Sequence, residues 1–266
     1  MLSKLLKYEI KATGRIFLPL FLALLIFALI TRLISPLGPE EWNTTAIISM
    51  IIYIIIMVGM FVTTLIMMIQ RFYKNLLSDE GYLMLTLPVK PWKHIVSKLL
   101  VSMFWVVTSG IVAITSILII TLEIGEITKL AMQFRIIYHQ ALADLGPSIY
   151  LLAFEIIIGI LIGLASCILI VYASIAIGHL FSQHKMLASF GAFIGLTTLS
   201  QIFFMLISIV PGNFYFPNIH ITSHDFIGMQ TLIQLAVAYG IILTGLLCAA
   251  YFAVTNFILS KRLNLE

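Results

Sequence analysis

The residues with metal-binding chemistry stand close together at His220, His224 and Asp225. Two imidazoles four residues apart, followed by a carboxylate, are donors that zinc accepts. The same residues are also ordinary in a polar loop, and the turn-forming pair Pro217 and Asn218 stands directly before them. We therefore expect a polar loop at this place, and zinc binding by His220 and His224 stays an open alternative.

Glu155 is a carboxylate inside a long apolar run. A charge inside a membrane-spanning helix is costly, and such residues often belong to a transport pathway or a proton relay. Glu155 also stands about one to two helical turns from the end of its run, where a side chain reaches water or a neighbouring helix. The sequence predicts either a pathway residue or a hydrogen-bonded acid near the interface.

The sequence lacks three short motifs that are typical of ATPases, metalloproteases and esterases. It has no Gly-x-x-x-x-Gly-Lys-Ser/Thr phosphate loop, no His-Glu-x-x-His and no Gly-x-Ser-x-Gly. Cys167 and Cys248 stand within apolar stretches, as small packing residues do. We expect no catalysis, no bound cofactor and no metal in this chain.

The elements that position these residues are membrane-spanning helices. Of the 266 residues, 61% are hydrophobic and 10% are charged, whereas soluble domains have about 45–50% and about 25%. The net charge of +4 does not indicate nucleic acid, because the basic residues stand at the ends of apolar runs, where lipid phosphates lie. The chain is therefore expected to contact membrane lipid and no nucleic acid.

Six apolar runs are long enough to cross a hydrocarbon core of about 30 Å, which takes roughly 20 residues. They cover about residues 16–34, 45–70, 97–122, 149–178, 186–210 and 231–259. The expected fold class is all-α, a polytopic membrane protein with six transmembrane helices in one domain over residues 1–266. Twelve of the 15 Lys and Arg residues fall on the side that holds both termini, which the positive-inside rule assigns to the cytoplasm.

Two stretches predict helices along the membrane surface. At the N-terminus, apolar residues recur at helical spacing with lysines between them: Leu2, Leu5, Leu6 and Ile10. This pattern predicts an amphipathic helix on the cytoplasmic lipid surface before the chain turns inward. On the outer side, residues 127–138 within the 123–148 loop predict a short amphipathic helix that Gly146 and Pro147 end.

The connection between the second and third runs carries an apolar patch in a basic loop. Asp79 and Glu80 suit the start of a short helix, and Pro88 and Pro91 suit its end and the start of the next helix. The patch between them consists of Tyr82, Leu83, Leu85 and Leu87. It predicts either a contact with a partner protein or a helix that tucks under the bundle or into the lipid interface.

This segment also resembles a known family. The stretch Asp79-Glu80-Gly81-Tyr82-Leu83-Met84-Leu85-Thr86-Leu87-Pro88-Val89, followed by Pro91-Trp92 and Lys98-Leu99-Leu100, resembles the segment after the second span of ABC transporter permeases of the type-2 exporter superfamily. It is most similar to the short six-span permeases of Gram-positive bacteria, particularly clostridia. Further similar stretches are Lys7-Tyr8-Glu9, Ser174-Ile-Ala-Ile-Gly178, His184-Lys185, Ser189-Phe-Gly191 and the C-terminal residues 261–266. The resemblance thus covers essentially the whole chain.

The resemblance implies a permease subunit in a bacterial cell membrane that exports a drug, a peptide antibiotic or a lipid. A second permease, either a copy or a paralogue, would pair with it. A separate ATP-binding subunit would dock on it and carry ATP and Mg. By position, residues 2–13 would be a connecting helix, and about 78–88 a coupling helix. The coupling helix would contact the ATP-binding subunit through Asp79, Glu80, Gly81, Tyr82, Leu85, Thr86, Leu87 and Pro88.

Two other classes remain open on the same sequence. A secondary carrier or channel without ATPase would use Glu155 as a pathway residue, because such proteins need polar groups near mid-membrane. A membrane sensor or scaffold would recruit a partner without transport. The identity of the substrate, export against import, and any role of the outer segments 123–148 and 211–230 are left open.

Overall fold

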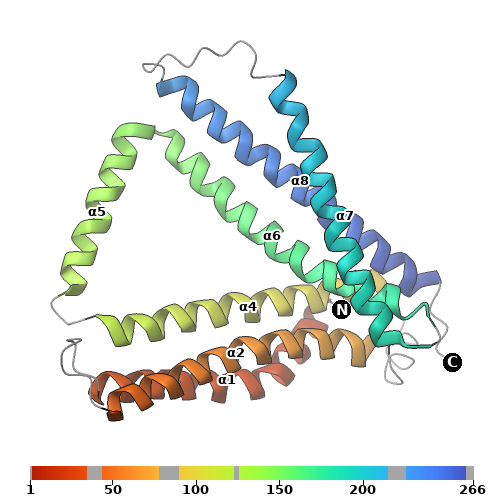
Figure 1. The fold of residues 1–266 in the computed structure, drawn as a ribbon, viewed down its shortest axis with the longest axis horizontal. Helices are drawn as coiled ribbons and strands as arrows, with labels where there is room; N and C mark the ends of the chain where they lie inside the picture. The colour runs from red at the N-terminus through yellow and green to blue at the C-terminus, as the bar shows by residue number, and fades with distance from the viewer. Residues whose placement is uncertain are drawn as a thin grey trace. The chain divides into compact units, whose positions relative to one another are not determined.

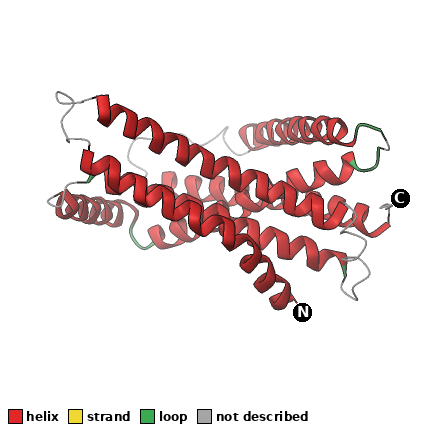
Figure 2. Cartoon of the chain, turned by 90° about the horizontal axis from the view of Figure 1, so that it is seen from below, coloured by secondary structure: helices red, strands yellow, loops and turns green. Residues whose placement is uncertain are grey.

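The computed structural model describes residues 2–34, 44–77, 90–122, 126–181, 183–214 and 226–261 (Figure 1). The elements found in these residues are helices, and six of them are long and apolar enough to cross a membrane. Figure 2 shows these helices in red. The prediction of an all-α chain with six membrane-spanning helices is confirmed, and the protein is a multi-pass membrane protein. Its contacts divide it into two compact units, Met1–Ile136 and Ile137–Glu266.

The first unit is a bundle of three long helices, α1 (Leu2–Ile34), α2 (Thr44–Leu77) and α4 (Pro91–Thr121), each packed against the other two. On α1, Phe17, Phe21, Leu24 and Ala28 recur at intervals of three and four residues, so they share one face. This face packs against Tyr53 and Met60 of α2 and Val101, Trp105 and Ala113 of α4. The remaining apolar side chains of these helices are exposed, as lipid-facing residues are.

The N-terminal amphipathic stretch is not a separate element. Helix α1 runs without interruption from Leu2 to Ile34, through the point where the sequence predicts a turn from the membrane surface. Leu6 packs against the core of the first unit, while Lys4, Lys7 and Lys11 are exposed. Intrahelical hydrogen bonds and the contacts of Leu6 therefore extend the first span as one helix.

The second unit is built around α6 (Ser148–Gly178), which packs against α7 (Lys185–Phe214) and α8 (Phe226–Lys261). The buried residues of α6 lie toward its C-terminal end: Ile168, Leu169, Tyr172, Ala173, Ser174, Ile175, Ala176 and Gly178. Helix α8 adds Tyr251, Thr255, Ile258 and Leu259 near its own end. The core of this unit is therefore concentrated at one end of its helices.

Helix α5 (Glu126–Leu145) precedes α6 and confirms the amphipathic helix predicted in the outer loop. It is 20 residues long and extends beyond the predicted run at its C-terminal end. Gly146 ends it at a φ of 58°, a left-handed conformation that glycine adopts without steric cost. Its N–H donates to the Leu142 carbonyl at 2.9 Å, and Pro147 then precedes α6.

Candidate functional site

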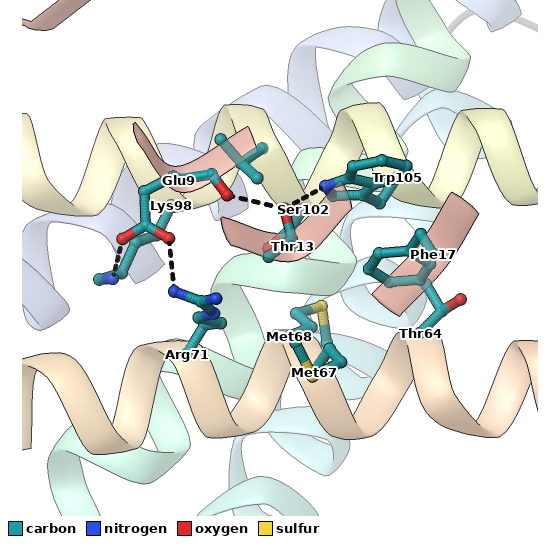
Figure 3. Close-up of a pocket in the computed structure, with 11 residues that line it drawn as sticks. Glu9, Thr13, Phe17, Thr64, Met67, Met68, Arg71, Lys98, Ser102 and Trp105 are labelled. Atoms are coloured by element: carbon teal, nitrogen blue, oxygen red, sulfur yellow. Dashed lines mark hydrogen bonds and ion pairs between the residues drawn. The ribbon is translucent and has the colours of Figure 1, made fainter. Parts of the chain in front are cut away.

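A charge cluster joins the three helices of the first unit (Figure 3). The Lys98 Nζ of α4 donates to Glu9 Oε1 of α1 at 2.8 Å. A guanidinium nitrogen of Arg71, on α2, lies 3.4 Å from Glu9 Oε2. The side chains of Lys98 and Glu9 are only 3% and 11% exposed, so little water competes for these charges. Removal of one charge would therefore destabilise the others, because a poorly hydrated ion is costly when it loses a partner.

The cluster continues into the apolar core through hydrogen bonds. Thr13, one helical turn after Glu9, donates to the Glu9 carbonyl at 2.8 Å. The indole N–H of Trp105 donates to Thr13 Oγ1 at 2.7 Å. The same indole stacks on Phe17 with ring centroids 4.5 Å apart. The positions of the charges are thereby fixed by the packing of α1 on α4.

Further polar contacts link the helices along the whole unit. Thr64 and Ser109 hydroxyls lie 3.2 Å apart, and those of Tyr53 and Ser116 lie 2.8 Å apart. At the far end, Arg32 of α1 donates to the Ile119 carbonyl of α4 at 2.7 Å. Lipid supplies no hydrophobic force that pushes helices together, so such bonds and close packing hold membrane bundles. The first unit is thus held by polar contacts from one end to the other.

The cavity beside the cluster is too small for a substrate. Glu9, Thr13, Arg71, Lys98 and Trp105 contribute to its lining (Figure 3). Its volume of about 20 Å³ is room for about one water molecule, whereas small-molecule pockets have about 300–1,000 Å³. The arrangement can hold a proton or a water molecule in place and can join three helices. It cannot bind an organic molecule.

A larger hollow lies in the second unit, between α7 and α8. Its volume is about 380 Å³, and its lining is apolar apart from the hydroxyls of Ser200 and Tyr251: Leu196, Leu199, Ile202, Phe203, Leu206 and Leu247. The two helices pack against α6 more than against each other, although the Tyr239 hydroxyl donates to the Ile207 carbonyl at 3.2 Å. The result is an open, apolar groove.

Glu155 lies in α6 and is half-buried. Its Oε2 atom is buried and makes no hydrogen bond to any described residue. Gly159 lies one turn after Glu155 on the same face of α6. A Cβ added at Gly159 would lie 3.4 Å from the Ile241 side chain, so this face of α6 meets α8. Glu155 therefore lies on the face of α6 that meets α8, as a pathway residue or an interhelical acid would.

The glycines of α6 and α7 differ in how closely they approach a neighbouring helix. A Cβ at Gly178 would lie 2.6 Å from the Ser189 Cα and would also overlap its Oγ, so only glycine fits here. At Gly163, Gly191 and Gly195 an added Cβ would meet nothing within 4 Å. A glycine in close contact with a neighbouring helix is thus found at Gly159 and Gly178 and not at these three.

The predicted contact residues fall into three groups. Of the N-terminal residues, Leu2, Leu5 and Leu6 are half-buried and Ile10 is exposed, directly beside Glu9. The coupling residues Asp79, Glu80, Gly81, Tyr82, Leu85, Thr86, Leu87 and Pro88 lie outside the described residues. The same holds for His220, His224 and Asp225. Within the described ranges, no three His, Cys, Asp or Glu side chains gather as metal ligands do.

The charge cluster was not predicted as a site, although its parts stand in the sequence. Lys98, Val101 and Trp105 recur at intervals of three and four, so Lys98 lies on the apolar face of its helix. Glu9 similarly shares the face of Thr13 and Phe17 on α1. A search for single charges on otherwise apolar helix faces would have found both.

No protein-family model, curated protein or solved structure matches this chain. The resemblance to ABC permeases therefore rests on the sequence stretches themselves. What they imply stays a prediction.

Proposed function

We propose that this chain is the membrane-spanning permease subunit of an ATP-driven exporter whose ATP-binding subunit is a separate chain. The observation that carries the proposal is the ion-pair cluster of the part-buried Glu9 and Arg71 with the buried Lys98. Helix α2 ends at Leu77 and α4 begins at Pro91, so the predicted coupling segment 78–88 joins these two helices. Arg71 and Lys98 stand about two turns from those helix ends.

The cluster supports a mechanical role for this end of the unit. A subunit that pushes on segment 78–88 would move the end of α2 and the start of α4 together. Because Glu9 contacts both helices, α1 would move with them as one body. In a poorly hydrated setting such ion pairs are stronger than at a wet surface, so the joint would transmit force without loosening. The positive-inside rule favours the cytoplasm for this end, where an ATP-binding subunit would be found.

The second unit supports an apolar or amphipathic substrate. The groove between α7 and α8 is lined almost entirely by apolar side chains and has the volume of a small-molecule site. We propose a drug, peptide antibiotic or lipid as substrate class, and a second permease as partner, either a copy or a paralogue. ATP and Mg would be held by the ATP-binding subunit, in the cell membrane of a bacterium.

The decisive experiment is a pull-down of the detergent-solubilised chain from its native membrane, with partners identified by mass spectrometry. The test variant is Leu85→Asp/Leu87→Asp in the coupling segment. The matched control is Met186→Asp/Leu187→Asp, at residues 83% and 75% exposed at the start of α7, predicted for the same side of the membrane. We expect an ATP-binding subunit with the wild type and the control but not with the test variant. Absence of any ATPase in several mild detergents would overturn the proposal.

A second candidate, a proton-coupled carrier, is favoured by the buried Oε2 of Glu155. Proteoliposomes with an imposed pH gradient and an enclosed pH-sensitive dye test it without ATP. Proton flux that Glu155→Gln abolishes and Glu126→Gln on α5 preserves would support the carrier. Proton flux equal to that of protein-free liposomes would exclude the carrier. If the pull-down recovers an ATP-binding subunit but no substrate is transported, a membrane sensor or scaffold is favoured.

A further inference from the structure

We propose that α5 lies in the lipid–water interface at the membrane surface where α4 ends and α6 begins, and that its apolar face is inserted among lipid acyl chains. The face consists of Ile127, Leu130, Phe134, Ile137, Tyr138 and Ala141. Its partner is the bilayer, not a protein. The proposal depends on the membrane-spanning helices and is independent of the proposed transport function.

The connections of α5 hold both of its ends at the membrane surface. The helix is not one of the six candidate spans, so it begins and ends on one side of the bilayer. Residues 122–125 separate it from α4, and only Gly146 and Pro147 separate it from α6. An extended connection from α4 reaches at most about 18 Å, and the one to α6 about 11 Å. A helix of 20 residues is about 30 Å long. It therefore cannot stand perpendicular to the membrane surface, and both of its ends stay near that surface.

The exposure of α5 leaves an apolar face that a water-facing helix would not keep. Every residue from 131 to 140 is exposed. At the 100° spacing of a helix, the six residues of the apolar face fall within about 120° of one another. Among them Ile127, Phe134 and Ile137 are 57%, 74% and 62% exposed. The opposite side carries the polar Lys129, His139 and Gln140 together with the exposed Met132 and Ile136, so the polar residues of α5 gather there.

A contact between Tyr138 and Tyr150 indicates that the apolar face of α5 is directed toward the bilayer. The hydroxyls of Tyr138 and Tyr150 lie 2.9 Å apart. Tyr138 belongs to the apolar face of α5, and Tyr150 is the third residue of the membrane-spanning α6. The face that holds Tyr138 is therefore directed to the side on which α6 enters the membrane. Tyrosines are enriched at this depth because the ring is apolar and the hydroxyl is polar.

Spin labelling at matched positions tests the proposal. Cys167 and Cys248, both free, are first replaced by Ala. Single labels are then placed by Phe134→Cys and Ile137→Cys on the apolar face. Met132→Cys and Ile136→Cys serve as controls, since they replace apolar, exposed residues on the opposite side of the same helix. Each full-length variant is reconstituted in phosphatidylcholine–phosphatidylglycerol vesicles.

Collision with oxygen reports lipid, and collision with a water-soluble nickel chelate reports water. We expect an oxygen-to-nickel collision ratio at least several-fold higher at 134 and 137 than at 132 and 136. Four equally water-exposed labels would overturn the proposal. Labels at 134 and 137 that meet neither reagent would also overturn it, in favour of a covering protein. If the cysteine-free background aggregates, Phe134→Trp and Ile136→Trp in the native sequence replace the labels. We then expect brominated lipid to quench the tryptophan fluorescence of Phe134→Trp more than that of the wild type, and that of Ile136→Trp no more than that of the wild type. Equal quenching in the two variants would overturn the proposal.

Discussion

The helices of the two units are held together by different contacts. In the first, hydrogen bonds and ion pairs link α1, α2 and α4 from Glu9 at one end to Arg32 at the other. In the second, the buried residues of α6 lie toward one end, where Gly178 meets the Ser189 backbone of α7. Because lipid does not drive helices together, a bundle is rigid only where such contacts exist. The first unit is thus fixed along its length. The second is fixed at one end and leaves a groove between α7 and α8.

The largest effect is expected from Glu9→Ala in the first unit. It leaves Lys98 and Arg71 without this carboxylate, and removal of one partner of a buried ion pair costs about 3–5 kcal/mol. Thermal unfolding in a mild detergent should show a large decrease of the midpoint temperature. Lys7→Ala, at an exposed position of the same helix, is the control and should change little. Equal midpoints for the two variants would mean that the cluster does not hold the unit.

Gly178→Ala should have the largest effect in the second unit. Its methyl group would meet the Ser189 backbone at 2.6 Å, and overpacking of this kind costs about 1–3 kcal/mol or more. Gly163→Ala is the matched control on the same helix, since its methyl group would enter open space. Midpoints of thermal unfolding should fall for the first variant and stay or rise for the second. A tolerated Gly178→Ala would show that close approach does not hold α6 on α7.

A smaller decrease in stability is expected when the hydrogen bond of Trp105 to Thr13 is removed and the ring stacking on Phe17 is kept. Trp105→Phe removes the indole donor to Thr13 and retains a ring for Phe17. Hydrogen bonds between membrane helices contribute about 0.6 kcal/mol on average and at most about 1.7. A double-mutant cycle with Thr13→Val measures the coupling. A coupling energy of zero would restrict the polar contribution to the charged residues.

The smallest effect is expected from pH at the α6–α7 turn. Burial, and to a lesser extent the positive charge of Lys185, lowers the pKa of His179 from its ordinary value of 6.5. The unfolded chain then binds this proton more readily than the folded chain. The stability from neutral His179 is thus complete above about pH 6.5 and decreases as the pH falls below it. His179→Gln should weaken the pH dependence of the unfolding midpoint in this range, and His139→Gln on exposed α5 should not. Unchanged pH dependence in His179→Gln would contradict this assignment.

The helices were predictable because length and hydropathy alone decide them. Each of the six apolar runs became a helix, and Gly146 with Pro147 ended α5 where turn chemistry demands it. The continuity of α1 was not predicted, since the lysines between Leu2 and Ile10 indicate a surface helix. Those lysines are exposed, but Leu6 packs on the core and draws the stretch into the first helix.

The site was harder to predict because it depends on which helices meet. Glu9 and Lys98 are 89 residues apart in the chain, and no local pattern says that they form a pair. Gly178 and Gly163 look alike in sequence, yet only Gly178 faces a neighbouring backbone. Local spacing assigns a residue to a face of its helix, whereas the partner of that face follows from the packing of the whole bundle.

Glu9 and Arg32 of α1 also fix how α1 and α4 lie beside each other over the thickness of the membrane. Glu9 contacts α4 at Lys98, and Arg32, 23 residues later, contacts it at Ile119, 21 residues after Lys98. At 1.5 Å per residue, these contacts are about 35 Å apart on α1 and about 32 Å apart on α4. A hydrocarbon core is about 30 Å thick. Since α1 is held to α4 at both levels, the two helices cannot slide along each other. The unit must meet a thinner bilayer by tilting as a whole.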